Sequence, residues 1–379
     1  MFRRSLGSVQ LFAIIYTAVA SAIYFALGVV ADHALGLTPL VFLGSGIFFV
    51  LAAMTYVEGA SLHQDRAGST VFARYAFNEL VSFVAGWAIL LDYIILIAVT
   101  SLSATNYLAA FDKPLGEGTD ELVLSLAIIA YVAVRNVRGF STTRTRRIGA
   151  LVIADLAVQL LLIVLGLIVF FSWDALIDPI KLGTYPQWKD VVFALGIATV
   201  TFTGLESASG LSGEVAIGRR GLKRLINSAG ITVIVVYTGI ALVALTALPV
   251  AGNETSLSRN FLEAPMLGIA ESFHQKWLAD TLKYVVAALG AITLIAAANS
   301  AMMGLSRLAY CWASRGDRGG GNLGAYLWAG TSWGCFPRDI RRRLACRCCS
   351  WRCICWPTLG RWGGSPEAAN QDRSNERCD

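Results

Sequence analysis

Long apolar runs alternate with short polar segments along the first 310 residues of the chain. Between Leu151 and Ser172, for example, the one charged residue is Asp155. A helix needs roughly 20 apolar residues to cross the hydrocarbon core, and continuous runs of this length favour helices over the short alternating strands of a membrane barrel. We therefore predict an all-α membrane protein with about eight spanning helices, within Val9–Val30, Pro39–Ala60, Leu80–Leu108, Leu122–Val137, Ile148–Ser172, Val191–Gly213, Gly230–Val250 and Thr281–Tyr310.

The composition agrees with this prediction. The chain is 56% hydrophobic and 15% charged, whereas soluble domains have about 25% charged residues. Basic residues are concentrated in the polar segments that share a side with the N-terminus if the spans alternate, which predicts a cytoplasmic N-terminus in the cell membrane. The net charge of +6 then follows from this topology, and we expect the lipid bilayer, and no nucleic acid, as a partner.

The composition changes after Tyr310. All eight cysteines lie at or beyond Cys311, and the segment 311–379 is also rich in Arg, Trp and Gly. A zinc or iron–sulfur module and a disulfide framework are two interpretations, but the cysteine spacing is unlike that of structural zinc sites and a cytoplasmic tail would be reducing. A shift of reading frame near residue 310 is the third. We expect a membrane domain at 1–310 and a disordered, out-of-frame tail at 311–379; sequencing the gene beyond codon 310 and translating every frame tests this.

Two of the runs contain interruptions close to mid-membrane. The first run includes YTAVASAIYFALG (Tyr16–Gly28), with several small residues together, and the sixth includes ATVTFTGLESASG (Ala198–Gly210). Broken helices in matching positions of two halves are typical of secondary transporters, because free backbone N–H groups can hold a carboxylate and free carbonyls can hold a cation. Small residues that permit close helix packing are the alternative interpretation of the first run.

Three ordered motifs resemble the amino acid–polyamine–organocation superfamily of permeases over roughly residues 5–310. They are YVEGASLHQDRAGSTVFARYAFNELVSFVAGWAILLDY (Tyr56–Tyr93), FTGLESASGLSGEV (Phe202–Val215) and ANSAMMGLSRLAY (Ala298–Tyr310). The resemblance implies a five-plus-five inverted-repeat (LeuT-like) fold, of which this chain would hold the first eight of about twelve spans. Where many members have a Gly-Ser-Gly-like break in span one, this chain has Val19-Ala20-Ser21.

The resemblance also implies where a substrate would bind. Backbone groups at the break of span one would hold its carboxylate, carbonyls at the break of span six would hold its amino group, and the aromatic ring of span six would cover it. Asn299 in span eight could face this pocket or only bridge helices. The candidate substrate-binding residues are Ala20, Ser21, Ala22, Ile23, Tyr24, Phe202, Thr203, Gly204 and Asn299.

Carboxyl groups within the spans are the candidates for ion coupling. Ionisable residues in membrane spans are rare and mark functional sites by default, and Glu206, Asp155 and Asp92 meet this description. Each could carry a coupling proton or bind a sodium ion; hydrogen bonding to neighbouring helices is the structural alternative for Asp155 and Asp92. We expect no cofactor and no metal site.

These features predict a secondary active transporter that moves amino acids or related amines by alternating access. The alternatives are a truncated product without transport activity, or a channel-like or sensor-like membrane protein. A membrane enzyme is disfavoured because the spans contain no cluster of His, Cys or paired carboxylates that would provide catalytic groups.

Overall fold

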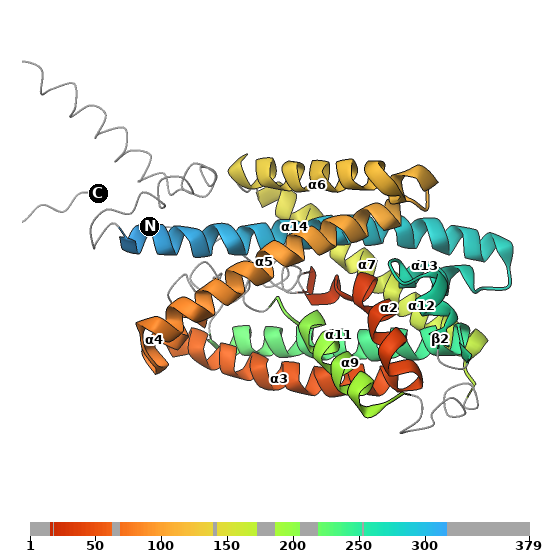
Figure 1. The fold of residues 1–379 in the computed structure, drawn as a ribbon, viewed down its shortest axis with the longest axis horizontal. Helices are drawn as coiled ribbons and strands as arrows, with labels where there is room; N and C mark the ends of the chain where they lie inside the picture. The colour runs from red at the N-terminus through yellow and green to blue at the C-terminus, as the bar shows by residue number, and fades with distance from the viewer. Residues whose placement is uncertain are drawn as a thin grey trace, which may run out of the picture. The chain divides into compact units, whose positions relative to one another are not determined.

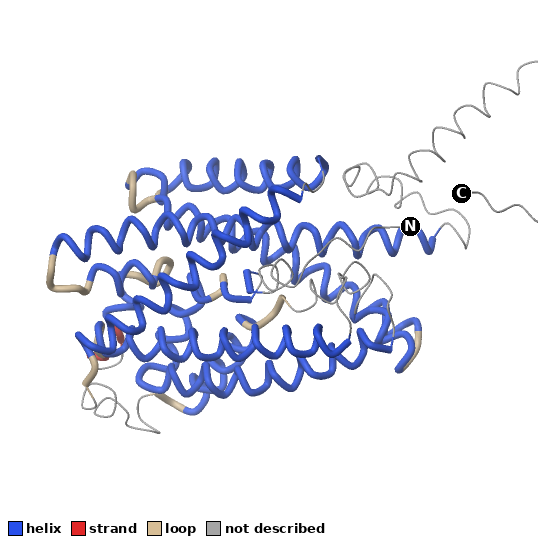
Figure 2. The backbone as a smooth tube through the Cα atoms, turned by 180° about the vertical axis from the view of Figure 1, so that it is seen from behind, coloured by secondary structure: helices blue, strands red, loops and turns tan. Residues whose placement is uncertain are grey.

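The computed structural model describes residues 16–17, 19–62, 69–138, 142–172, 186–204, 219–251 and 254–316. Of the predicted tail at 311–379, residues 311–316 continue a helix, and the remainder lies outside the described residues. The described part is almost wholly helical (Figures 1 and 2). Its α-helices are α2 (Ile23–Ala34), α3 (Thr38–Leu62), α4 (Ser69–Ala76), α5 (Glu79–Leu108), α6 (Gly118–Arg138), α7 (Thr142–Phe170), α9 (Trp188–Thr201), α11 (Arg219–Ala247), α12 (Ser256–Asn260), α13 (Pro265–Glu271) and α14 (Lys276–Gly316).

Shorter elements connect the helices. The 3-10 turns η1 (Leu35–Leu37) and η2 (Lys113–Gly116) follow α2 and precede α6. A two-residue antiparallel hairpin, β1 (Val250–Ala251) and β2 (Glu254–Thr255), follows α11, with Val250 opposite Thr255. Within the described ranges this hairpin is the departure from the predicted all-helical structure.

Each of the eight predicted runs contains a helix. Five stretches are long and apolar enough to cross a membrane: Ile23–Tyr56, Glu79–Leu108, Gly149–Phe170, Asn227–Ala247 and Lys276–Ala309. The first stretch joins two predicted spans, because α2 and α3 are separated only by η1. The helices α6 and α9 fall outside this set, and α9 has only 14 residues because it ends at Thr201.

The outer surface of the helices is apolar, whereas polar side chains are buried between them. Ile168 of α7 is 75% exposed, and Ile95 of α5 is 61% exposed. On the same helix α7, Asp155 and Gln159 are completely buried. The core between the helices is mostly apolar as well, so it is the apolar outer surface that differs from a soluble protein's, and it fits helices whose outer faces contact lipid.

The spans pack in pairs, and the two members of each pair are five positions apart in the predicted order of spans. The three most extensive helix–helix contacts join α2 to α9, α3 to α11 and α5 to α14, which are spans one and six, two and seven, and three and eight. Two repeats of five spans related by a pseudo-two-fold axis would pair their equivalent members in this way. The packing therefore agrees with the predicted inverted repeat.

Connecting segments gather at two ends of the helices (Figure 1). At one end, α4 leads into α5, and the Asn78 side chain caps α5 by accepting from Val81 N at 2.9 Å. At the other end, Asn106 donates to Glu263 across 3.0 Å, which joins the α5–η2 turn to the α12–α13 segment. Both of these segments are on the outer side in the predicted topology.

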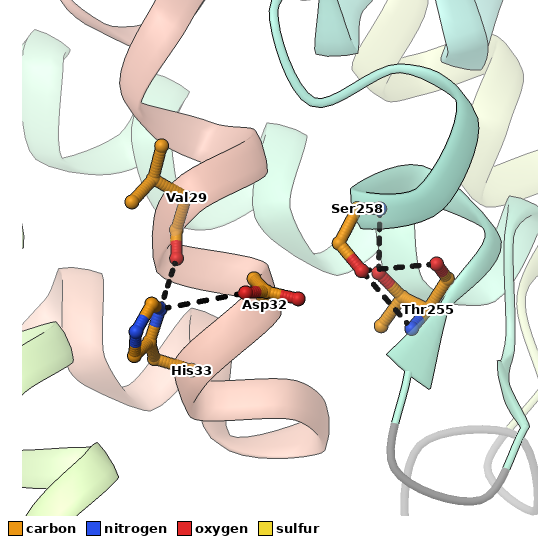
Figure 3. A network of polar contacts seen from close by, with 5 residues as sticks. All are labelled: Val29, Asp32, His33, Thr255 and Ser258. Carbon is orange, nitrogen blue, oxygen red and sulfur yellow. Dashed lines mark hydrogen bonds and ion pairs between the residues drawn. The ribbon is translucent and has the colours of Figure 1, made fainter.

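The C-terminal end of α2 lies beside α12 (Figure 3). His33 contacts the Val29 carbonyl at 3.1 Å, one turn earlier in the same helix. The start of α12 is fixed by a capping box, in which the Thr255 hydroxyl accepts from Ser258 N at 2.9 Å. Such caps satisfy N–H groups that a helix leaves free at its start.

At Gly28, α2 passes close to the backbone between α12 and α13. A Cβ atom added there would lie 2.3 Å from the Leu262 carbonyl oxygen, which is backbone and cannot rotate away. We expect Gly28→Ala to lower stability by about 1–3 kcal/mol through overpacking, measured as thermal unfolding in detergent. Gly196→Ala is the matched control, because no described atom outside its own stretch of helix lies within 4 Å of its added Cβ. Equal melting temperatures for the two variants would contradict this close approach.

Candidate functional site

The helix of span one is interrupted at Ser21 and Ala22. Val19 and Ala20 are helical, the next two residues form a turn, and α2 begins at Ile23. At the interruption the Ala22 amide donates to the Val19 carbonyl at 3.3 Å, a bond between residues three apart. Ser21 is completely buried, and its hydroxyl has no hydrogen-bond partner among the described residues. The break therefore contains a buried polar group that no described residue satisfies.

The helix of span six also ends within the run that predicted it. α9 stops at Thr201, and the amide of Thr203 turns back to the Val200 carbonyl at 3.0 Å. Gly204 has a φ of 123°, a conformation that favours glycine because it has no Cβ. Glu206 lies outside the described residues, as does the rest of the predicted run beyond Gly204.

One tyrosine of α11 lies between the two interruptions. The Tyr237 hydroxyl donates to the Val19 carbonyl at 2.5 Å and lies 3.5 Å from the Thr201 carbonyl. Its ring packs against Phe202 with the ring centroids 4.9 Å apart, and against Phe42 at 5.5 Å. The ends of two helices that are far apart in sequence are thus held close together in the core.

A buried polar cluster connects α7 to both sides of the span-one break. The Tyr24 hydroxyl donates to Asp155 Oδ1 at 2.5 Å, and Gln159 Nε2 donates to Asp155 Oδ2 at 3.0 Å. Tyr16, which precedes the break, donates to Gln159 Oε1 at 2.9 Å. Because Tyr16 and Tyr24 flank the interruption and both bind α7, this helix supports the two halves of span one.

The carboxyl group of Asp155 is buried, and no described residue gives it a cationic partner. The hydroxyl of Thr293 on α14 is a further hydrogen-bond partner, so the donors around it are neutral groups. Among the described residues, no Lys, Arg or His forms an ion pair with it. An isolated buried charge costs several kcal/mol, and a proton or a cation that reached this position would remove that cost.

The remaining sequence candidates lie at different places. Asn299 accepts a hydrogen bond from Asn136 Nδ2 at 3.1 Å, an amide pair between α14 and α6. Asp92 is partly buried on α5 and also has a polar partner. The structure thus brings the two breaks, Tyr24 and Asp155 together, whereas Asn299 forms a helix–helix contact.

Comparison with known proteins identifies the family. A family model for amino acid permeases matches residues 6–316. The chain belongs to the amino acid permease family. This membership agrees with the predicted superfamily and with a multi-pass membrane protein that is not an enzyme.

Individual relatives of this permease chain are distant. The "Low-affinity putrescine importer PlaP" of Escherichia coli strain K12 is 23% identical over 205 residues, which cover 52% of this chain and 44% of the importer; the protein of the same name in strain O157:H7 matches equally. The match thus spans less than half the length of these curated relatives. Two mutant forms of the manganese transporter of Eremococcus coleocola are 14% and 15% identical, with TM-scores of 0.47 and 0.48, over 91% of this chain and 71% of theirs.

Three residues of the site were missed by the sequence analysis of this permease chain. Gln159 follows Asp155 by four residues, so it lies on the same helix face, and that spacing was a usable signal. Tyr16 is eight residues before Tyr24, and nothing local indicates that both contact α7. Tyr237 lies in an ordinary apolar run, and only the packing of α11 against both breaks shows its position.

Proposed function

We propose that this chain is a secondary active transporter that moves amino acids or related amines across the membrane by alternating access. Substrate is held at the breaks of spans one and six, by backbone around Ser21 and by carbonyls at the end of α9. The proposal includes Ala20, Ala22, Ile23 and Tyr24 on the first span and Phe202, Thr203 and Gly204 on the second.

The meeting of the two breaks is the observation that carries this proposal. The Val19 and Thr201 carbonyls are both within 3.5 Å of one hydroxyl, so the backbone at both breaks faces a common region. Next to them is the buried Ser21 hydroxyl without a described partner. Helix ends of this kind hold the charged groups of substrates and the coupling ions in secondary transporters.

The proposal also covers coupling and orientation. Asp155 is the preferred proton carrier, because its carboxyl is completely buried and hydrogen-bonded directly to Tyr24 beside the break. The N-terminus faces the cytoplasm of the cell, which the basic residues of the connecting segments support. An N-terminal tag should then react with antibody only in permeabilised cells.

Uptake by the purified protein in vesicles tests the function. Putrescine is the first labelled probe, since it is named for the relative in Escherichia coli, and a panel of amino acids follows. We expect saturable uptake of at least one of these compounds. The absence of saturable uptake and exchange, with protein confirmed in the vesicles, would contradict the proposal.

Ser21→Ala separates a role in binding from a role in folding. The hydroxyl has no described partner, so its removal should leave the melting temperature unchanged. If it binds a charged group of the substrate, losing about 1.5–3 kcal/mol should raise the KM for uptake by roughly tenfold or more. Thr238→Val is the matched control, because the buried Thr238 hydroxyl on α11 likewise has no partner among the described residues. A KM that rises equally in both variants would argue against a specific role of Ser21.

A further inference from the structure

The break in span one needs a physical cause, because its sequence has no glycine or proline. Val19, Ala20, Ser21, Ala22 and Ile23 are residues that a helix accepts. Sharp interruptions of helices occur at proline, at pairs of glycine or serine, at π-bulges, or where a side chain inserts between the backbone hydrogen-bonding groups. The last of these causes fits the geometry here.

The Tyr237 hydroxyl occupies the position of a missing backbone hydrogen bond. In a continuous helix the Ile23 amide would donate to the Val19 carbonyl, four residues earlier. Instead, that carbonyl accepts from the Tyr237 hydroxyl at 2.5 Å and from the Ala22 amide at 3.3 Å, and the Ile23 amide interacts with the same hydroxyl oxygen. A hydroxyl can donate and accept at once, so it satisfies both sides of the interruption.

The ring of Tyr237 is fixed, so the hydroxyl cannot withdraw from the break. Tyr237 is completely buried, and its ring contacts Phe42 of α3 and Phe202 at the end of α9. Phe202 in turn packs against Phe49 of α3, with centroids 5.3 Å apart. The same side chain therefore reaches span one through its hydroxyl and span six through its ring.

We infer that Tyr237 is a positioning residue, which opens span one at Ser21-Ala22 and ties this opening to the end of α9. A glycine would interrupt the helix through the freedom of its backbone, and in this chain the Tyr237 hydroxyl has that effect. The inference explains how the proposed binding site is formed. Only its uptake measurements rest on the proposed function. Without the hydroxyl, the Ile23 amide can bond to Val19 and the helix can close.

Tyr237→Phe tests this inference, because it keeps the ring packing and removes only the hydroxyl. We expect hydrogen–deuterium exchange of the amides in residues 19–26, measured in lipid nanodiscs, to become slower as the helix closes. The KM for uptake should rise about tenfold, because a closed helix no longer presents the Ser21 hydroxyl and its neighbouring backbone in the geometry of the break. Faster or unchanged exchange in these residues would overturn the inference.

A second substitution provides a rescue that a general packing defect would not show. Ala22→Gly added to Tyr237→Phe should reopen the break and lower the KM again by about fivefold, since glycine is disfavoured in helices relative to alanine by roughly that factor. Exchange in residues 19–26 should return toward the wild-type rate. If the single variant does not fold, recovery of the folded double variant supports the inference, and failure of both overturns it.

Tyr107→Phe is the matched control. Tyr107 is equally buried, and its hydroxyl donates to the Tyr24 carbonyl at 2.7 Å, which lies within α2 and not at the break. Tyr107→Phe should not slow hydrogen–deuterium exchange in residues 19–26, and adding Ala22→Gly to it should not lower the KM. Equal slowing in Tyr107→Phe and Tyr237→Phe would overturn the inference. Hydrogen–deuterium exchange can be measured without substrate. A wild-type protein that shows no uptake would therefore contradict the proposed function but still allow the role of Tyr237 to be tested.

Discussion

Asp155→Asn should abolish uptake driven by a pH gradient while leaving exchange of substrate across the membrane. Asparagine has nearly the same shape as aspartate but cannot gain or lose a proton. In the structure, Asp155 is completely buried, accepts from Tyr24 and Gln159, and has no cation among its described partners. Accumulation of labelled substrate in vesicles with an imposed pH gradient should fall to the level without a gradient, whereas counter-exchange at equal pH should continue.

The physical reason is that coupling needs a group whose charge changes with the transport step. A proton that binds Asp155 cancels a charge whose burial costs several kcal/mol, and it alters the hydrogen bond to Tyr24 immediately after the break. A neutral asparagine is fixed in one charge state. It also presents an N–H₂ group where the carboxylate accepts from a donor, which should lower stability by about 1–3 kcal/mol.

Two further variants separate coupling from other effects. Asp120→Asn changes an exposed carboxylate in the first turn of α6, and it should retain gradient-driven uptake. Asp92→Asn tests the competing candidate on α5. Loss of gradient-driven uptake in Asp92→Asn but not in Asp155→Asn would move the coupling role to α5, and loss of exchange in Asp155→Asn would indicate a role in binding instead.

The membrane helices were predictable because the hydrocarbon core contains no water to bind backbone N–H and C=O groups, which restricts what can span it. Long runs without charges have few alternatives to a helix, so each predicted run contains one. The sharp end of α9 was also visible, since Thr203, Gly204 and Glu206 interrupt an apolar run. The break of span one was harder to predict, because its small residues fit both an interruption and close packing.

The polar contacts could not be predicted, because they depend on which helices pack together. Asp155 was recognised as an unusual charge, but its bond to Tyr24 joins residues 131 positions apart. Asn299 was an equally good candidate from sequence, yet it pairs with Asn136 of α6. A polar residue in a span can face a substrate, an ion or another helix, and the sequence around it is similar in each case.

Phe202→Ala should be the most damaging change to the break of span six. The Phe202 side chain is buried and contacts Phe49 and Tyr237. Truncating a buried phenylalanine costs about 3–5 kcal/mol through lost contacts and the cavity that remains. The melting temperature should fall by several degrees, and the KM for uptake should rise because the ring that would cover the substrate is absent.

The control for this variant lies on the same helix. Phe193→Ala removes the same kind of side chain from α9, but Phe193 is 56% exposed and its described ring contact is with the partly exposed His33 of α2. Its loss leaves no internal cavity, so both the melting temperature and the KM should change little. If Phe193→Ala were as damaging as Phe202→Ala, the effect would come from the stability of α9 as a whole. If only Phe202→Ala has these effects, they arise from the contacts of Phe202 with Tyr237, whose hydroxyl bonds the Val19 carbonyl.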